Sequence, residues 1–256
     1  MKLKNALTIA GSDPCAGAGL QADLRVFVSL NVYGMAAPSA ITIQNTKGVK
    51  EIIPLPAGSL RKQLKTLFDD IKIDAVKTGM LLTKENILAV EGAVKKHKIK
   101  RFVLDPIIIS GTGRKLLKDD AIPALKKRLF SLALIITPNI NEAEMLTGIK
   151  IKDEKDVRLA AKAIYKMGPK YILIKGGHLK GDASDFLFDG KKFRIFKGKR
   201  AGGVKLHGAG CVFSAAITAY LAKGMSVPEA VGEAKRFINK AIKKAVKIGK
   251  GKMVLI

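Results

Sequence analysis

Two kinds of segment alternate along this chain. Short apolar runs, typical of buried β-strands, are followed by segments in which apolar residues recur every three or four positions, typical of helices that cover a sheet. The alternation favours a mainly parallel sheet with helices on both faces, because parallel strands need crossover connections. The predicted strands are 7–10, 36–46, 74–78, 101–105, 134–137 and 171–175, and the predicted helices include 20–28, 60–68, 87–94, 157–167, 211–223 and 227–247.

The pattern changes to short strands after Gly177. Residues 185–188 and 192–196 are strand-like, and Asp189-Gly190 between them is a dipeptide typical of a tight hairpin turn. No linker-like, low-complexity or repeated segment interrupts the sequence. We therefore predict a single α/β domain over residues 1–256.

Polar residues follow several of the predicted strands. Ligands of open α/β sheets bind beyond the carboxyl ends of the strands, so these residues are candidates for a site. An enzyme explains their placement better than a structural protein does. The residues are Gly11 to Asp13, Gln44 and Asn45, Lys77 to Met80, Asp105, Asn139, and Lys175 to His178.

The run His207-Gly208-Ala209-Gly210-Cys211 precedes a strongly apolar predicted helix. Small residues allow a tight turn, and the free N–H groups and the dipole at a helix start attract an anion. A thiol pKa is lowered at a helix start, so Cys211 is a candidate general base for phosphoryl transfer. For this run alone, a small-residue cap beside an inert thiol is an equal alternative.

The chain carries 47 Lys and Arg residues against 21 Asp and Glu residues, a net charge of +26. Such a field attracts nucleotides, phosphorylated substrates or nucleic acid. The basic residues are dispersed and aromatic residues make up 5%, so we favour a solvated basic surface over a specific nucleic-acid site. With two cysteines, no evident signal peptide and no apolar run that could span a membrane, we expect a cytoplasmic protein.

A set of short motifs occurs in one order along nearly the whole chain. They are Gly11-Ser12-Asp13, Gly17-Ala18-Gly19, Gln21-Ala22-Asp23, Gln44-Asn45-Thr46, Lys77 to Leu81, Asp105-Pro106, Thr137-Pro138-Asn139, Glu142-Ala143-Glu144, Lys175 to His178, and His207 to Cys211. The set resembles that of the hydroxymethylpyrimidine and phosphomethylpyrimidine kinases of thiamin synthesis. Two departures are Pro14-Cys15-Ala16, where the family usually has serine and glycines, and Ala209, where it usually has threonine.

The resemblance implies a ribokinase-like fold, with helices on both faces of the central sheet and a small β flap. It implies that ATP and Mg²⁺ serve to phosphorylate 4-amino-5-hydroxymethyl-2-methylpyrimidine and then its monophosphate. It also implies a homodimer. The sequence contains no Gly-x-x-x-x-Gly-Lys-Ser/Thr loop, so a Walker-type phosphate site is excluded.

The resemblance also implies roles for individual residues. The amides of Gly208, Ala209, Gly210 and Cys211 would stabilise the transferring phosphoryl group, with Cys211 as general base. The residues that would bind ATP or Mg²⁺ are Asp105, Asn139, Glu142, Lys175 and His207, with Glu142 holding Mg²⁺ directly or through water. Alternatively, Glu142 caps its helix with Asn139 or Asn141 as N-cap, and Lys175 faces solvent.

The amide of Gln44 carries a donor and an acceptor, so it can pair with the edge of an aminopyrimidine ring. By resemblance, the other pocket residues would be Gly11, Ala18, Asp23, Met80 and Ile107. Asp23 could instead be an acid favoured near a helix start, and Met80 could be ordinary core.

Two other functions stay open at this point. A pyridoxal kinase on the same scaffold would act on another flat heteroaromatic ring with a hydroxymethyl group. A basic nucleic-acid-binding or regulatory protein on an inactive kinase fold is the third interpretation, and the motif residues named above argue against it.

Overall fold

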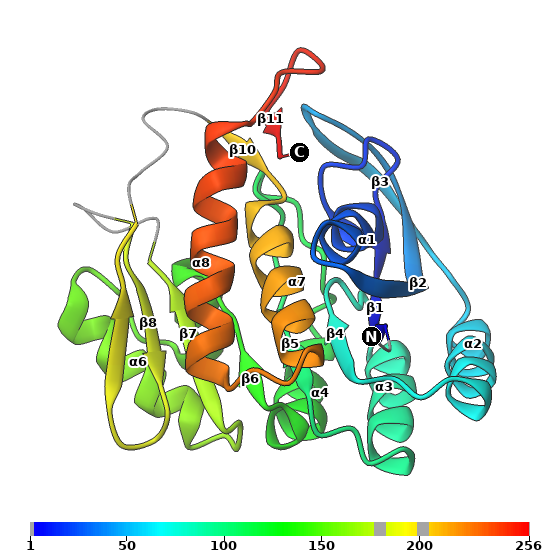
Figure 1. The fold of residues 1–256 in the computed structure, drawn as a ribbon, viewed down its shortest axis with the longest axis horizontal. Helices are drawn as coiled ribbons and strands as arrows, with labels where there is room; N and C mark the ends of the chain where they lie inside the picture. The colour runs from blue at the N-terminus through cyan, green and yellow to red at the C-terminus, as the bar shows by residue number, and fades with distance from the viewer. Residues whose placement is uncertain (1–2, 177–182, 199–204, 256) are drawn as a thin grey trace.

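The computed structural model describes residues 3–176, 183–198 and 205–255, so Gly177 and His178 of the Lys175 to His178 motif lie outside the described residues. A nine-stranded sheet runs through the molecule in the order β3-β2-β1-β4-β5-β6-β7-β8-β9 (Figure 1). The strands are β1 Lys4–Ser12, β2 Val32–Asn45, β3 Gly48–Pro54, β4 Ala75–Thr78, β5 Phe102–Leu104, β6 Ile135–Ile136, β7 Tyr171–Lys175, β8 Asp185–Phe188 and β9 Phe193–Phe196.

The centre of the sheet is parallel and its two edges are antiparallel. Strands β2, β1, β4, β5, β6 and β7 pair in parallel, whereas β3 at one edge and β8 and β9 at the other pair antiparallel. The last residues of β2 extend beyond β1 and pair with β3, which forms the predicted flap. A separate parallel pair joins β10 (Leu206–His207) to β11 (Met253–Val254).

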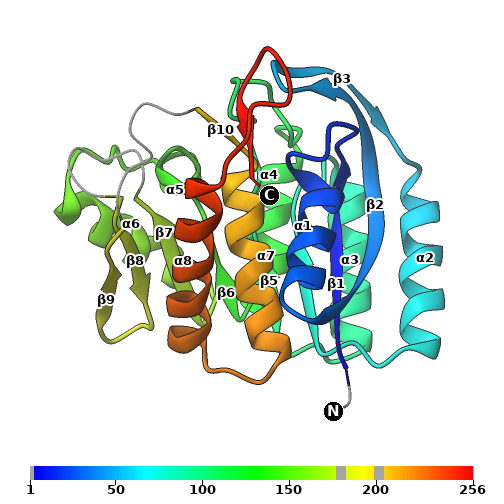
Figure 2. The same cartoon turned by 45° about the horizontal axis from the view of Figure 1, so that its top comes forward.

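Helices cover both faces of the sheet, as the sequence predicts (Figure 2). One face packs against α1 (Gly19–Ser29), α7 (Ala209–Ala222) and α8 (Val227–Lys243). The opposite face packs against α2 (Ala57–Asp70), α3 (Lys84–Lys96), α4 (Ala121–Leu129), α5 (Ile140–Thr147) and α6 (Glu154–Tyr165), with the short 3₁₀ turn Phe130–Leu132. Most apolar side chains of the central strands are therefore buried in one of two cores.

Helix α7 is the central helix of its layer. Ten of its side chains are buried, including Phe213 and Ile217, and it packs against α8, α1 and several strands. A helix that is apolar on all sides is stable only inside a protein. Its first residue, Ala209, is thereby fixed above the carboxyl ends of the strands.

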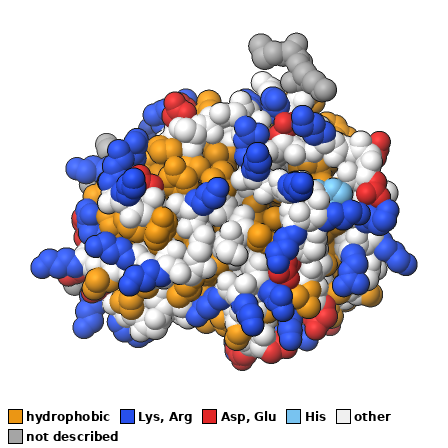
Figure 3. Space-filling view, turned by 90° about the horizontal axis from the view of Figure 1, so that it is seen from below, with side chains coloured by type: hydrophobic (Ala, Val, Ile, Leu, Met, Phe, Trp, Pro, Cys, Tyr) orange, Lys and Arg blue, Asp and Glu red, His pale blue; other side chains and the backbone are white. Residues whose placement is uncertain are grey.

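The surface is basic without one dominant basic patch on the face drawn in Figure 3, where Lys and Arg side chains are interspersed with apolar and neutral groups. No helix in the described ranges has both the length and the apolar character needed to cross a bilayer.

Candidate active site

The loop between β1 and α1 packs against the turn that begins α7. Gly208 has a φ of +75°, and a Cβ on this residue would lie 1.9 Å from the carbonyl oxygen of Gly17. At Gly17, an added Cβ would lie 2.1 Å from the His207 ring. Only glycine fits at these two positions, so the loop and the helix start form one compact unit.

His207 lies at the centre of a polar cluster. Its Nε2 is 2.9 Å from Asp13 Oδ2 and 2.8 Å from Gln44 Nε2. Asp13 also accepts hydrogen bonds from the backbone N–H groups of Cys15 and Ala18. Asp13, Cys15 and His207 place an oxygen, a sulfur and a nitrogen within 4.8 Å of one another. The hydrogen bonds named above already engage both carboxylate oxygens of Asp13 and the Nε2 atom of His207.

The structure places apolar residues that were predicted to line the substrate pocket close to one another. A Cβ on Gly11 would lie 2.4 Å from the Met80 methyl group, so Met80 packs directly on the end of β1. Met80 belongs to a small cluster of buried side chains, against which Ile107 packs. Ala18 lies in the adjacent β1–α1 loop as the N-cap residue of α1.

The structure corrects the expectation that Asp23 lines the pocket. Asp23 is fully buried, its Oδ2 accepting hydrogen bonds from Lys77 Nζ at 2.7 Å and from Thr8 Oγ1 at 2.6 Å. Lys77 is also fully buried. Asp23 therefore has no surface with which to contact a substrate, and its role is to pair with the Lys77 ammonium.

A second buried pair lies at the ends of β5 and β7. Lys175 Nζ is 2.9 Å from Asp105 Oδ1, which also accepts a hydrogen bond from Thr137. The other oxygen of Asp105 accepts from Ser214 on α7. A Cβ on Gly210 would lie 3.3 Å from Lys175 Nζ, so this ammonium lies beside the predicted anion-binding turn. The alternative that Lys175 faces solvent is wrong, because its side chain is only 12% exposed.

Glu142 caps helix α5, one of the two roles considered for it. The Asn139 side chain accepts a hydrogen bond from Glu142 N at 2.9 Å, and Glu142 Oε2 accepts one from Asn139 N at 2.8 Å. This reciprocal capping box uses the Asn139 side-chain oxygen. Burial raises the pKa of Glu142 to about 7, although the Lys175 charge acts in the opposite direction.

The prediction that Cys211 has a lowered pKa is wrong for the free protein. Burial raises the pKa of its thiol to about 11, and the charges of Asp23 and Asp105 add to the increase. The Lys77 ammonium and a hydrogen bond from the Gly19 backbone act in the opposite direction. Removal of water around the thiol thus outweighs the field of the helix start.

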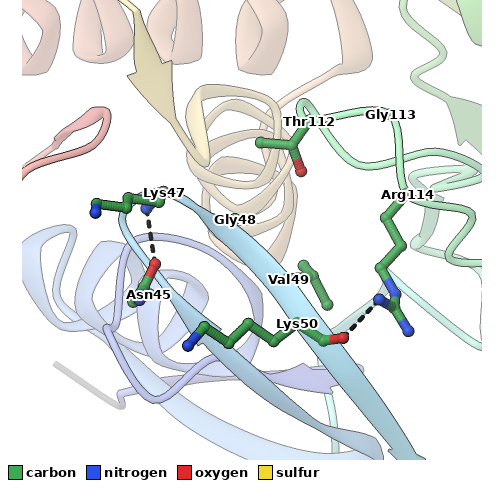
Figure 4. A pocket seen from close by; sticks show the side chains of 8 residues that line it. All are labelled: Asn45, Lys47, Gly48, Val49, Lys50, Thr112, Gly113 and Arg114. Carbon is green, nitrogen blue, oxygen red and sulfur yellow. Dashed lines mark hydrogen bonds between the residues drawn. The ribbon is translucent and has the colours of Figure 1, made fainter.

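A hollow of about 520 Å³ opens between the β2–β3 turn and the loop before α4 (Figure 4). Arg114 lines it and donates a hydrogen bond to the Lys50 carbonyl oxygen. The hollow is lined by Asn45, Lys47, Gly48, Val49, Lys50, Thr112, Gly113 and Arg114. One of its lining residues, Asn45, directly follows Gln44 in the sequence. The lining includes neither the α7 turn nor Lys175.

Residues 13–255 match the family model for phosphomethylpyrimidine kinase. The chain belongs to the phosphomethylpyrimidine kinase family. It is 43% identical over 247 residues to the hydroxymethylpyrimidine/phosphomethylpyrimidine kinase of Aquifex aeolicus, covering 96% of this chain and 97% of that protein. It is 44% identical over 246 residues to the thiamine biosynthesis bifunctional protein ThiED of Geobacter sulfurreducens, covering 96% of this chain and 50% of that relative, so it spans half the relative's length.

The fold of this phosphomethylpyrimidine kinase family member is also that of a solved pyridoxal kinase. The ADP complex of the Bacillus subtilis pyridoxal kinase superposes with a TM-score of 0.91 at 39% identity, covering 99% of this chain and 97% of that one. The ribokinase-like fold expected from the motifs is thus confirmed.

Sequence reasoning did not give roles to three polar residues around the site of this family member. Lys77 pairs with Asp23, Asp13 holds His207, and Ser214 donates to Asp105. A signal for two of them was present. Lys77 is a lysine within a run of buried strand residues, and Ser214 is a hydroxyl within an apolar helix.

Proposed function

We propose that this chain is an ATP-dependent kinase that phosphorylates 4-amino-5-hydroxymethyl-2-methylpyrimidine and then the resulting monophosphate. The family match over residues 13–255 carries this proposal. The placement of Lys175, Asp105 and the start of α7 around one point supports it, because phosphoryl transfer depends mainly on positioning and on charge stabilisation.

The start of α7 would hold the transferring phosphoryl group. Gly208 is the N-cap residue, and no side chain in the described part of the chain caps the helix. The backbone N–H groups of Ala209, Gly210 and Cys211 are therefore available to an anion. The Lys175 ammonium beside Gly210 adds a positive charge at the same place.

Cys211 would accept the proton of the substrate alcohol in the first phosphorylation. Its thiol is protonated at neutral pH in the free protein, so ionisation must be favoured by groups that face it. The buried Lys77 ammonium is such a group, because its charge lowers the pKa of Cys211. The second acceptor is already anionic, so it needs charge neutralisation more than it needs a base.

The residues near α5 suit Mg²⁺, which prefers oxygen ligands and keeps several waters. Glu142 is a buried carboxylate whose raised pKa a cation would lower, so it is the residue we propose as a ligand, directly or through water. Asp105 would act through water, because Thr137, Lys175 and Ser214 already occupy its oxygens. The cation would neutralise charge on the ATP phosphates.

The pyrimidine would bind between the β1–α1 loop and the end of β4. Gln44 would pair with the ring edge, and Gly11, Ala18, Met80 and Ile107 would form the remaining wall. Gln44 is half-buried at the end of β2, and Met80 and Ile107 pack in one apolar cluster, which supports this placement. His207 lies 2.8 Å from Gln44 Nε2, so it would serve the pyrimidine side of the site in place of the nucleotide.

Pyridoxal kinase activity is the second candidate. It is favoured by the TM-score of 0.91 with the Bacillus subtilis pyridoxal kinase. The family model and the Aquifex aeolicus relative favour the pyrimidine.

We also propose that the chain forms a homodimer as one domain per protomer, in the cytoplasm. Large apolar side chains are exposed on β2 and β3, where Ile41 pairs with Ile53 across the ladder and the nearby Ile43 is 43% exposed. Such a patch supports an interface with a second copy.

The proposal is tested by measuring ADP release with MgATP and each acceptor in turn. Turnover with the pyrimidine alcohol and with its monophosphate is expected. Turnover with pyridoxal alone would replace the pyrimidine with the second candidate, and no turnover with any acceptor would overturn the assignment as a kinase of this class.

A further inference from the structure

A single nitrogen of His207 faces two groups of opposite hydrogen-bonding character. His207 Nε2 is 2.9 Å from a carboxylate oxygen of Asp13 and 2.8 Å from the amide nitrogen of Gln44. A ring nitrogen either donates or accepts, a carboxylate oxygen only accepts, and an amide nitrogen only donates. The two contacts therefore cannot both be hydrogen bonds as the atoms stand.

The charge of Asp13 determines which of the two contacts of His207 Nε2 is a hydrogen bond. Its carboxylate accepts hydrogen bonds from Cys15 N at 3.0 Å and Ala18 N at 2.9 Å, which favours the ionised form. His207 Nε2 therefore carries the proton and donates it to Asp13.

The proton on His207 Nε2 determines which way the Gln44 amide is turned. A half-turn of the amide exchanges its oxygen and nitrogen with almost no change of shape. Because Nε2–H of His207 is a donor, an NH₂ group facing it would bring two donors together, so the Gln44 atom that faces it is the oxygen, which shares this N–H with Asp13. The NH₂ group of Gln44 is then turned away from His207, and the oxygen keeps a second lone pair.

We propose that Asp13 and His207 are positioning residues that lock the Gln44 amide, so that its NH₂ group is offered to a ring nitrogen that accepts and its oxygen to an adjacent amino group. This inference rests on the proposed function for the identity of the substrate. It assigns to the pair a part in selecting a 4-aminopyrimidine edge, in which an acceptor nitrogen lies beside an amino donor.

The proton on His207 can be observed without any activity. The chain has three histidines, so long-range ¹H–¹⁵N spectra of ¹⁵N-histidine-labelled protein contain few signals, and His207→Gln identifies those of His207. We expect a protonated Nε2 at neutral pH in the ligand-free protein. An unprotonated Nε2 would overturn the proposal that His207 fixes the Gln44 amide. This NMR test of the proton does not depend on which substrate the chain acts on.

Kinetics of matched variants test the consequence for binding. His207→Gln keeps a donor within reach of Asp13, whereas His207→Phe fills the space without one. We expect His207→Phe to raise the KM of the pyrimidine about tenfold, the loss of roughly one good hydrogen bond, and His207→Gln to restore most of it, with the KM of ATP unchanged in both. His97→Gln is the control, because His97 stacks on Phe68 away from this cluster.

Substrate analogues distinguish loss of the fixed Gln44 orientation from general damage to the site. Replacing the ring nitrogen next to the amino group by CH removes the acceptor, and we expect the wild type to disfavour this analogue about tenfold. The preference should shrink toward equality in His207→Phe, because a free amide can rotate to suit either ring. Equal rises in the KM of pyrimidine and of ATP, or an unchanged preference in His207→Phe, would contradict the proposal.

Discussion

Lys77 Nζ lies 2.7 Å from Asp23 Oδ2 although both side chains are fully buried. Their charges act on the candidate base in opposite directions, because Lys77 lowers the pKa of Cys211 and Asp23 raises it. Asp23 Oδ1 has no hydrogen-bond partner among the described residues. The pair is therefore an electrostatic support for the site, held in place at some cost in stability.

Removing the ammonium from this pair should destabilise the protein strongly. Lys77→Met leaves the Asp23 carboxylate buried and unpaired, so we expect a loss of about 3–5 kcal/mol in the free energy of urea unfolding. Lys77→Met with Asp23→Asn should recover much of the loss, because no charge then remains buried. Equal stability of the single and double variants would show that the pairing does not control folding.

The thiol of Cys211 should react slowly at neutral pH. Because burial raises its pKa to about 11, only about one thiol in ten thousand is ionised at pH 7. In a Cys15→Ala background, where Cys211 is the remaining thiol, we expect the iodoacetamide rate to rise about tenfold per pH unit from 7 to 10. A plateau near pH 7 would mean that the field of the α7 start prevails over burial.

Loss of the Cys211 sulfur should harm the two phosphorylations unequally. General bases contribute about 10²–10⁴-fold, so we expect Cys211→Ala to slow phosphorylation of the alcohol by about 10²-fold. Phosphorylation of the monophosphate should fall less, because that acceptor is already anionic. Comparable losses in single-turnover rates of both steps would remove Cys211 from the role of base.

Gln44 should determine the affinity for pyrimidine without affecting ATP. Gln44→Leu has a similar size but no donor or acceptor, so we expect the KM of the pyrimidine to rise at least about tenfold. The KM of ATP should stay within about twofold, because no ATP contact is proposed for Gln44. Parallel increases in both constants would contradict this assignment.

Glu142 should release a proton when a cation binds. With its pKa raised from 4.5 to about 7, roughly half of this carboxyl is protonated at pH 7. Mg²⁺ binding in the presence of ATP should release a proton fraction that calorimetry in buffers of different ionisation enthalpy can measure, and Glu142→Gln should abolish that fraction.

The raised pKa of Glu142 also predicts the direction in which stability changes with pH. The folded state binds a proton at Glu142 more tightly than the unfolded state does, so stability should fall as pH rises from about 4.5 through 7. Glu142→Gln should flatten this part of the stability profile. A cation-linked proton release that persists in Glu142→Gln would place the titrating group elsewhere.

Regular alternation made the parallel core of the sheet predictable, but several elements escaped it, among them β3 and α4. Strand β3 is largely exposed, so it shows no buried apolar run. Helix α4 contains Pro123 near its start, a residue that reads as a helix breaker in sequence although the first turn has no need of its N–H. Both elements depend on their position in the fold more than on a local pattern.

The site residues were predictable by their place after strands, whereas their pairings were not. Asp23 and Lys77 are 54 residues apart, and only the close approach of α1 and β4 makes them partners. Cys211 shows the limit of a local rule. The start of a helix does favour a thiolate, but the extent of burial that opposes it is a property of the whole fold.

The most direct test of the central claim is a competition experiment read by mass spectrometry. The protein is incubated with MgATP and an equimolar mixture of 4-amino-5-hydroxymethyl-2-methylpyrimidine and pyridoxal, and the products are followed over time. We predict that pyrimidine monophosphate appears first and is converted to the diphosphate ahead of any pyridoxal phosphate. Pyridoxal phosphate as the sole or dominant product would contradict the account.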